Sequence, residues 1–286
     1  MIATFYHANY KKLLVLSIVI LLTSILYLGV TYARTGEFAE QSVSLKGGMT
    51  ITVLADKQYD IQALSNALPE FNVRALEERG KQRAIVFESV SEEEDSMLDQ
   101  IRATGVTAAQ GTYTTEFLGS TLGEKFYQQT LIAILVAFIG MSLVVFITFR
   151  NVVASSFVIL AAASDIISTL AVISFLGVQL STAGIAAFLM LIGYSVDTDI
   201  LLTTRVLKRK EGTVKERIGN AARTGLTMSL TSLAAVLAAY FFSSSDTIQQ
   251  IMLVISIGLI FDIIYTWLQN ATILRLYLER KHKDES

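Results

Sequence analysis

The sequence contains no cysteine, a single proline and only two histidines. Without cysteine, the chain can form neither a disulfide framework nor a thiolate metal site, and it has no cysteine nucleophile. His7 and His282 both lie in the terminal segments, which leaves no histidine in the interior for metal binding or general-base catalysis. The net charge of −2 gives no electrostatic reason to expect binding to nucleic acid.

Motifs for nucleotide-driven or covalent chemistry are also missing. The sequence has no P-loop, no Ser-His-Asp or Cys-His arrangement and no cluster of metal-ligating residues. We therefore predict that the chain is not an enzyme and holds no cofactor or metal. Any energy that it uses is then expected to come from an ion gradient.

Long apolar runs dominate what is present. Hydrophobic residues make up 52% of the chain and the mean hydropathy is +0.53. Several runs are apolar on every helical face over about 20 residues, long enough to cross about 30 Å of hydrocarbon. We predict a multi-pass α-helical membrane protein with six transmembrane helices: Leu13–Tyr32, Tyr127–Phe149, Val152–Leu176, Thr182–Val206, Thr224–Phe242 and Ile248–Leu274.

The distribution of lysine and arginine over the short connections predicts the orientation. The turns near 177–181 and 243–247 carry no positive residue, whereas the opposite side of the predicted bundle is rich in them. Because cytoplasmic loops carry the excess of positive charge, both termini are predicted to be cytoplasmic. The residues on that side are Lys11, Lys12, Arg150, Lys208, Arg209, Lys210, Lys215, Arg217, Arg223, Arg275, Arg280, Lys281 and Lys283.

Between the first two spans lies a stretch that is too long and too well patterned to be a loop. Apolar residues alternate from Val43 to Val53, which predicts a half-buried strand. A helix beginning at Asp56 and ended by Pro69, two strands near 72–77 and 83–89, a helix opened by a Ser91–Glu94 capping box and a last strand through 113–117 follow. This order predicts a small α+β ferredoxin-like extracytoplasmic domain.

The predicted division of the chain has four parts. Residues 1–32 hold a cytoplasmic tail and the first span, and residues 33–126 form the extracytoplasmic domain. Residues 127–274 hold spans two to six, and residues 275–286 form a cytoplasmic tail. The expected location is the cytoplasmic membrane, with the lipid bilayer as the surroundings of the helices.

Four aspartates fall inside the predicted spans: Asp165 in span three, Asp197 and Asp199 in span four, and Asp262 in span six. At about 2.5 to 3.5 kcal/mol each on insertion scales, they cost on the order of 10 to 14 kcal/mol together. A functional interpretation is a proton or ion path whose carboxyl groups change protonation state. A structural interpretation is that the acids are held by hydroxyl groups of neighbouring helices. We favour the functional interpretation for the span-four pair and leave both open for Asp165 and Asp262.

Helical geometry separates the span-four pair. At about 100° per residue, Asp197 and Asp199 point some 200° apart, so only one can face a given cavity. Tyr194 shares the face of Asp197. Span five carries four hydroxyl groups at a similar depth, which can bond a carboxylate on a facing helix or the backbone of their own helix: Thr227, Ser229, Thr231 and Ser232. We predict that Tyr194, Thr227 and Thr231 line the pathway.

The connection before span five carries Thr213 followed by Glu216, which is a capping box. It predicts a short interfacial helix that runs to about Arg223. The alternative for this connection is a solvated basic turn.

Three motifs carry a resemblance to a known family. They are Lys46-Gly47-Gly48, the span-four run Gly193-Tyr194-Ser195-Val196-Asp197-Thr198-Asp199 and the run Ala222-Arg223-Thr224-Gly225-Leu226-Thr227. In this order the chain resembles the SecF proteins over nearly its whole length, and more closely their archaeal branch, within the resistance-nodulation-division class of proton-driven proteins.

The resemblance implies one half of a twelve-helix bundle, the other half being a SecD-like subunit beside a SecY-type channel. It implies that the proton motive force drives the outside domains to assist export of an unfolded polypeptide. The family's span-four acid corresponds to Asp197 or Asp199, and its basic partner corresponds to Arg223. Bacterial members carry Tyr-Ser-x-Asn-Asp, with the acid at the position of Thr198, so the resemblance leaves that choice open.

Two other functions stay open from the sequence. One is a small-molecule efflux transporter on the same fold, although an outside domain of about 90 residues leaves little room for drug-sized clefts. The other is a purely structural scaffold for the translocation channel, in which neutral substitution of the aspartates is tolerated.

Overall fold

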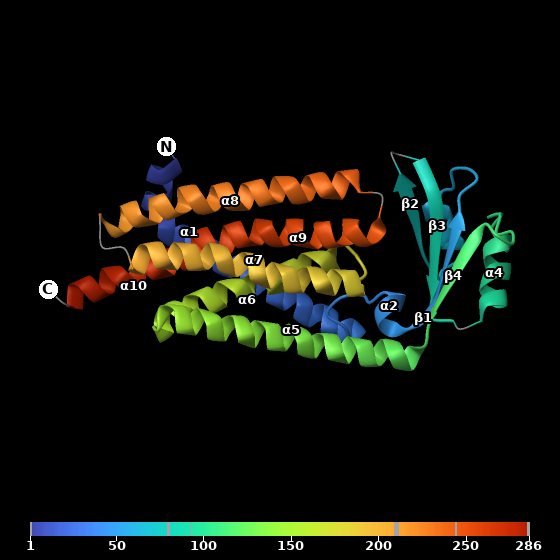
Figure 1. Cartoon of the computed structure of the whole chain (residues 1–286), viewed down its shortest axis with the longest axis horizontal. Coiled ribbons are helices and arrows are strands. Elements are labelled where there is room, and N and C mark those ends of the chain that lie inside the picture. The colour runs from blue at the N-terminus through green and yellow to red at the C-terminus, as the bar shows by residue number, and fades with distance from the viewer. Residues whose placement is uncertain (1, 79–80, 92, 209–211, 244, 285–286) are drawn as a thin grey trace.

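The computed structural model describes residues 2–78, 81–91, 93–208, 212–243 and 245–284. Long helices run side by side in one bundle, and a small sheet with its own helices lies at one end of it (Figure 1). The first and last helices both reach the end of the bundle that is farthest from the sheet (Figure 1). The described chain therefore has a helical part and a sheet part.

The bundle contains six stretches long and apolar enough to cross a membrane, and each overlaps one predicted span. The sixth is one continuous rod in which α9 passes through a π-helical turn, η1, into α10. The helices are α1 (Ile2–Thr35), α5 (Ser120–Phe149), α6 (Val152–Phe175), α7 (Thr182–Leu207), α8 (Val214–Phe242), α9 (Asp246–Ile264), η1 (Tyr265–Asn270) and α10 (Ala271–Asp284). The six-helix prediction is thus confirmed.

The six spans differ in how much of them the chain itself covers. About half of the apolar stretch is buried in α6 (50%), α7 (56%) and the sixth span (50%), but only 6–17% in α1, α5 and α8. Side chains such as Ile173, Leu191 and Leu259 form an apolar core between the central helices. The interior therefore belongs to α6, α7 and α9, while the outer helices present apolar surface to lipid or to another protein.

The sheet part has four antiparallel strands in the order β2-β3-β1-β4. Ile51 at the centre pairs with Phe87, and both are fully buried. Two helices cover one face through a single apolar core, and the second of them lies on the side away from the bundle (Figure 1). The elements are β1 (Gly48–Leu54), α3 (Ile61–Ala67), β2 (Asn72–Glu78), β3 (Lys81–Ser89), α4 (Glu94–Ala103) and β4 (Tyr113–Leu118).

The first predicted strand begins too early. Val43–Lys46 forms a one-turn helix, α2, and the chain then turns at two glycines with positive φ, 82° at Gly47 and 133° at Gly48. A Cβ atom at Gly48 would lie 2.3 Å from the carbonyl oxygen of Ser89. Only glycine fits this position, and the strand begins at Gly48 itself.

Two predicted helix starts are also corrected, and a third is confirmed. Asp60, rather than Asp56, caps α3 by accepting from the backbone N–H groups of Gln62 (2.9 Å) and Ala63 (3.2 Å). The predicted Ser91–Glu94 capping box is wrong, because α4 begins after Glu93 without a side-chain cap. The Thr213–Glu216 capping box is confirmed, but no separate interfacial helix follows, since α8 continues from it to Phe242.

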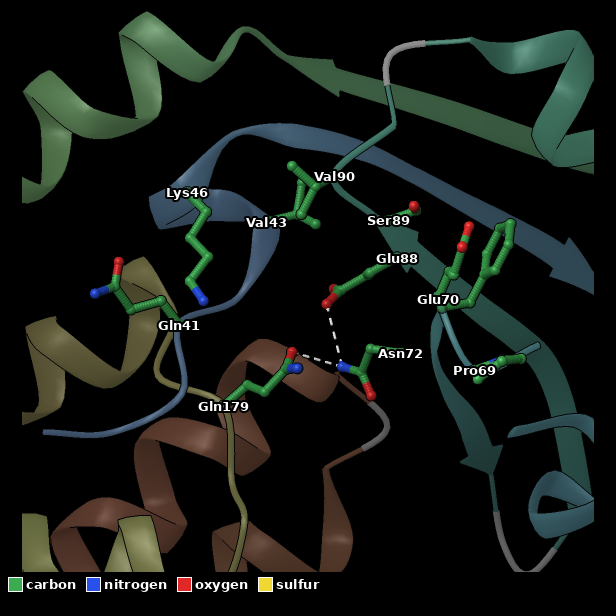
Figure 2. A pocket seen from close by; sticks show the side chains of 11 residues that line it. Gln41, Val43, Lys46, Pro69, Glu70, Asn72, Glu88, Ser89, Val90 and Gln179 are labelled. Carbon is green, nitrogen blue, oxygen red and sulfur yellow. Dashed lines mark hydrogen bonds between the residues drawn. The ribbon is translucent and has the colours of Figure 1, made fainter. Parts of the chain in front are cut away.

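A hydrogen-bonded junction joins the two parts at the turn between α6 and α7. The backbone of Leu180 in this turn donates to Glu40 (2.7 Å) and accepts from Ser42 (3.0 Å). Asn72 of β2 donates to the side-chain oxygen of Gln179 (2.5 Å) at the edge of a cleft of about 320 Å³ (Figure 2). The sheet is therefore tied to the residues that immediately precede α7.

Candidate functional site

The structure places the four membrane aspartates in two environments. Asp165, Asp199 and Asp262 are fully buried, each with 0% of its surface exposed. Asp197 is exposed on the outside of α7. The 200° separation expected for the span-four pair is thus realised, with Asp199 pointing inward and Asp197 outward.

The three buried carboxyl groups are held by side chains from neighbouring helices. The hydroxyl group of Ser195 on α7 donates to Oδ2 of Asp165 on α6. The amide of Asn270 donates to Oδ1 of Asp199 (2.7 Å). These bonds link α6 to α7 and α7 to the sixth span, so the acids are part of the packing between helices.

Asp262 on α9 differs because both of its oxygens accept hydrogen bonds. The hydroxyl group of Thr266 donates to Oδ1 (3.2 Å), and that of Ser229 on α8 donates to Oδ2 (3.3 Å). Electrostatic interactions connect Asp165, Asp199 and Asp262 with one another. We call this group the interior cluster: Asp165, Ser195, Asp199, Ser229, Asp262, Thr266, Gln269 and Asn270.

The π-helical turn η1 supplies three of the eight residues of the interior cluster. Such turns are uncommon and occur mostly as single-turn bulges inside α-helices, frequently at functional sites. Here the turn buries Thr266, Gln269 and Asn270, and the Gln269 amide donates to the hydroxyl group of Ser164 (3.3 Å). Tyr265 bonds the hydroxyl group of Ser168 on α6 (2.6 Å).

Sequence reasoning missed Gln269 and Asn270. They are two consecutive carboxamides inside the long apolar run of the sixth span. The argument that singled out the aspartates applies to them as well, because an amide without a partner is expensive in hydrocarbon.

The other predicted site residues lie outside the interior cluster. Asp197 and Tyr194 are exposed on α7, and Arg223, Thr227 and Thr231 are exposed on α8. We call these five residues the outer group. No ion pair of the described residues joins Asp197 to Arg223.

Thr227 and Thr231, the two span-five residues predicted to line the pathway, do not bond a facing carboxylate among the described residues. Thr227 donates to the backbone oxygen of Arg223 (2.8 Å), and Thr231 donates to that of Thr227 (2.8 Å), so both bond their own helix. The α8 hydroxyl group that reaches an acid belongs to Ser229, which lies between them and points inward.

Buried carboxyl groups without a cation suit proton uptake and release. No lysine or arginine forms an ion pair with the interior cluster in the described ranges. No group of three or more histidine, aspartate or glutamate side chains among those residues is placed to hold a metal ion. Isolated buried charge is costly, so a change of protonation state here would alter the packing of α6, α7 and α9.

The fold and the buried acids define a polytopic membrane protein with ionisable groups in its helix bundle. More specifically, the chain belongs to the SecD/SecF family of protein-export membrane proteins. Residues 99–280 match the family described as "Protein export membrane protein SecD/SecF, C-terminal".

Curated relatives and solved structures agree with this family. SecF of Methanocaldococcus jannaschii is 38% identical, with 94% of this chain and 96% of the relative covered. SecF of Pyrococcus furiosus is 34% identical, with 96% and 93% covered. The crystal structure of the translocon-associated SecDF of Thermus thermophilus matches with a TM-score of 0.73 at 21% identity and covers 96% of this chain. This chain spans 38% of that SecDF chain, and the likeness concerns the fold.

Proposed function

We propose that this chain is an accessory subunit of the Sec protein translocase and acts together with a SecD-like subunit. Curated relatives that it matches over nearly their full length are SecF proteins. The SecDF chain that shares its fold is more than twice as long. A separate SecD-like subunit would supply the remaining part, giving the two-half bundle that the family resemblance implies.

The outer group carries this proposal. Asp197 and Arg223 are charged side chains on the exposed surface of membrane-spanning helices. Facing lipid at this depth is unfavourable, and such residues normally face a bundle interior or a water-filled cavity. A second set of helices packed over α7 and α8 would bury them and complete a polar interface between the two subunits.

The proposed orientation puts both termini in the cytoplasm and the sheet part outside the cytoplasmic membrane. The excess of lysine and arginine on one side supports it, and so does the position of both chain ends far from the sheet (Figure 1). The strand order β2-β3-β1-β4 with α3 and α4 on one face supports a ferredoxin-like domain. From there it would contact the polypeptide that emerges from a SecY-type channel.

Proton flow along a pathway of acids would then shift α7. Asp197 and Arg223 at the interface, with Asp199, Asp165 and Asp262 behind them, form the proposed proton pathway. One charge crossing 100 mV releases about 2.3 kcal/mol, enough to bias a bundle between two arrangements. Because the junction ties the start of α7 to β2, a shift of this helix would reach the outside domain.

Export driven by the membrane potential tests the proposal. In vesicles that contain this chain, its SecD-like partner and the channel, Asp197→Asn, Asp199→Asn and Arg223→Ala should each lower potential-dependent export about tenfold or more, because each alters a charge on the pathway. Thr23→Val is the matched control, since Thr23 is exposed on α1 and bonds its own helix.

Two outcomes would contradict the proposal. If all three variants export normally while deletion of the chain still impairs export, the chain is a structural scaffold. If the reconstituted chain alone transports small molecules along a proton gradient, it is an efflux transporter.

A further inference from the structure

Four oxygens of the interior cluster have no hydrogen-bond partner within the described structure. They are Oδ1 of Asp165, Oδ2 of Asp199, Oε1 of Gln269 and Oδ1 of Asn270. Each of these residues is at most 1% exposed. Two of the atoms belong to carboxyl groups and two to carboxamides. An ionised carboxyl oxygen and a carboxamide oxygen can only accept, so the cluster lacks donors.

The carboxamides are anchored beside the acids by their nitrogen ends. Asn270 donates to Asp199 itself, and Gln269 donates to Ser164, the neighbour of Asp165 in α6. The oxygen end of each carboxamide therefore lies within the same buried region as the two carboxyl groups. A buried acceptor in such a place is expected to meet a donor.

Nothing charged and positive faces this region in the part of the chain that the structure describes. The titratable groups that meet there are Asp165 from α6, Asp199 from α7, Asp262 from α9 and Tyr265 from η1. The α8 residue in contact is Ser229, which is uncharged, while Arg223 of the same helix points outward. Asp262 already receives two hydroxyl groups, so the two incompletely bonded acids are Asp165 and Asp199.

We propose that Asp165 binds a proton on Oδ1, that Asp199 binds a proton on Oδ2, and that the carboxamide oxygens of Gln269 and Asn270 accept the two resulting O–H bonds, directly or through water. Two donors are created and two acceptors are available, so the hydrogen bonds balance. Gln269 and Asn270 are positioning residues in this arrangement. The site would hold two protons inside one chain, separate from the outer group.

This inference rests on the proposed proton coupling and adds that two protons are held at defined atoms of Asp165 and Asp199. The π-helical turn is the structural reason that the two protons have acceptors, because it buries both carboxamides on the side of α6 and α7. The two consecutive amides reach different helices, Gln269 bonding Ser164 of α6 and Asn270 bonding Asp199 of α7.

Infrared spectroscopy of the full chain in lipid vesicles at neutral pH tests the proposal, because a protonated carboxyl group and a carboxylate absorb at different frequencies. Exposed aspartates and glutamates are ionised at this pH, so a carboxylic-acid band should report the interior. Asp165→Asn and Asp199→Asn should each remove a part of this band, and the double variant should remove the sum of the two parts. Asp99→Asn, the same change on the exposed surface of α4, should leave it unchanged.

The positioning role has its own signature. Gln269→Met and Asn270→Leu keep the side-chain volume but remove both the accepting oxygen and the donating N–H group, so the acid band should shift in frequency as its hydrogen bonds change. In the unmodified chain, transfer to D₂O should shift the same band, a result that needs no variant to fold.

Three results would overturn the proposal: no carboxylic-acid band at neutral pH, a band that ignores both carboxamide variants, or a band that disappears when Na⁺ is added at constant pH. The last would mean that a metal ion occupies the site. None of these measurements depends on an export assay. A normal band with defective wild-type export would therefore overturn the translocase proposal alone.

Discussion

The interior cluster and the outer group both contain carboxyl groups at membrane depth, but the surroundings of these groups differ. Asp199 receives the amide of Asn270 from another helix, whereas Asp197, two residues away, is exposed and lacks an ion-pair partner among the described residues. The chain therefore completes one site by itself and leaves the other to be covered. The difference indicates which acids this subunit positions and which await a partner.

The largest expected effect is a difference in the free energy of unfolding between two glycine variants, one at the buried Gly225 of α8 and one at the exposed Gly193 of α7. A Cβ atom at Gly225 would lie 2.3 Å from the ring of Trp267, whereas one at Gly193 meets nothing within 4 Å. Gly225→Ala should lower the free energy of unfolding in detergent by about 1–3 kcal/mol because the ring must shift. Gly193→Ala should leave it unchanged or raise it by up to about 1 kcal/mol.

The same two glycine variants can also be measured with a SecD-like partner bound. If the partner covers the outer group, Gly193→Ala should weaken the complex while the isolated chain stays stable. Equal losses from both glycine variants in the isolated chain would show that the outer surface of α7 is packed as tightly as the interior.

A smaller effect is expected from the hydroxyl groups. Ser195→Ala removes a donor to Asp165 and should cost about 1 kcal/mol, the usual scale of hydrogen bonds between membrane helices. Thr227→Val removes a bond to its own helix and should change the unfolding free energy by less than about 0.5 kcal/mol. Equilibrium unfolding of the two variants in one detergent measures both, and a reversed order would contradict the division into two regions.

The junction should respond locally. Asn72→Ala removes the bond to Gln179 and should cost about 0.5–1.5 kcal/mol of contact between the sheet and the bundle. Because the chain has no cysteine, a single cysteine placed at Gln41, which lines the same cleft, would report access by its labelling rate, which should rise in the variant. Asn66→Ala on the exposed side of α3 is the control, and equal labelling in both would argue against a stabilising junction.

The smallest effect concerns a carboxyl group outside the membrane. The Tyr59 hydroxyl group donates to Asp56 (2.6 Å) and holds the pKa of that exposed carboxyl below its usual value. A lowered folded-state pKa means that the contribution to stability is present above the unfolded pKa and is lost as the pH falls through the folded one. Tyr59→Phe should return the pKa of Asp56 toward 3.8 in a carboxyl ¹³C titration, and an unchanged pKa would contradict this cause.

The spans followed from the length of continuous apolar runs, and the order of the strands and helices followed from hydrophobic periodicity. The residues at which individual strands and helices begin were harder to predict. Val43 and Leu45 alternate in a strand and also fit one helical turn, and the glycine pair decides between them. Asp56 and Asp60 are equally good caps as residue types, so only the hydrogen bonds distinguish them.

The sequence indicated most of the residues of the site, but it did not indicate which of them lie in the interior cluster and which in the outer group. The 200° separation showed that Asp197 and Asp199 face different ways, but the inward direction depends on where α6 and α9 pack. Thr227 and Ser229 are two residues apart on α8 and also point about 200° apart, so which of them faces inward again depends on where α9 packs. Gln269 and Asn270 depend on a π-helical turn, which no residue pattern in the sixth span announces.

The hydrogen-bonded turn before α7 makes that helix a lever. Its 26 residues form a rod about 39 Å long, anchored at one end to β2 through Gln179 and carrying Asp199 in its other half. A tilt of about 5° about its far end displaces the anchored end by roughly 3 Å, the length of one hydrogen bond. A rearrangement too slight to separate the packed helices would therefore suffice to release or re-seat the sheet on the bundle.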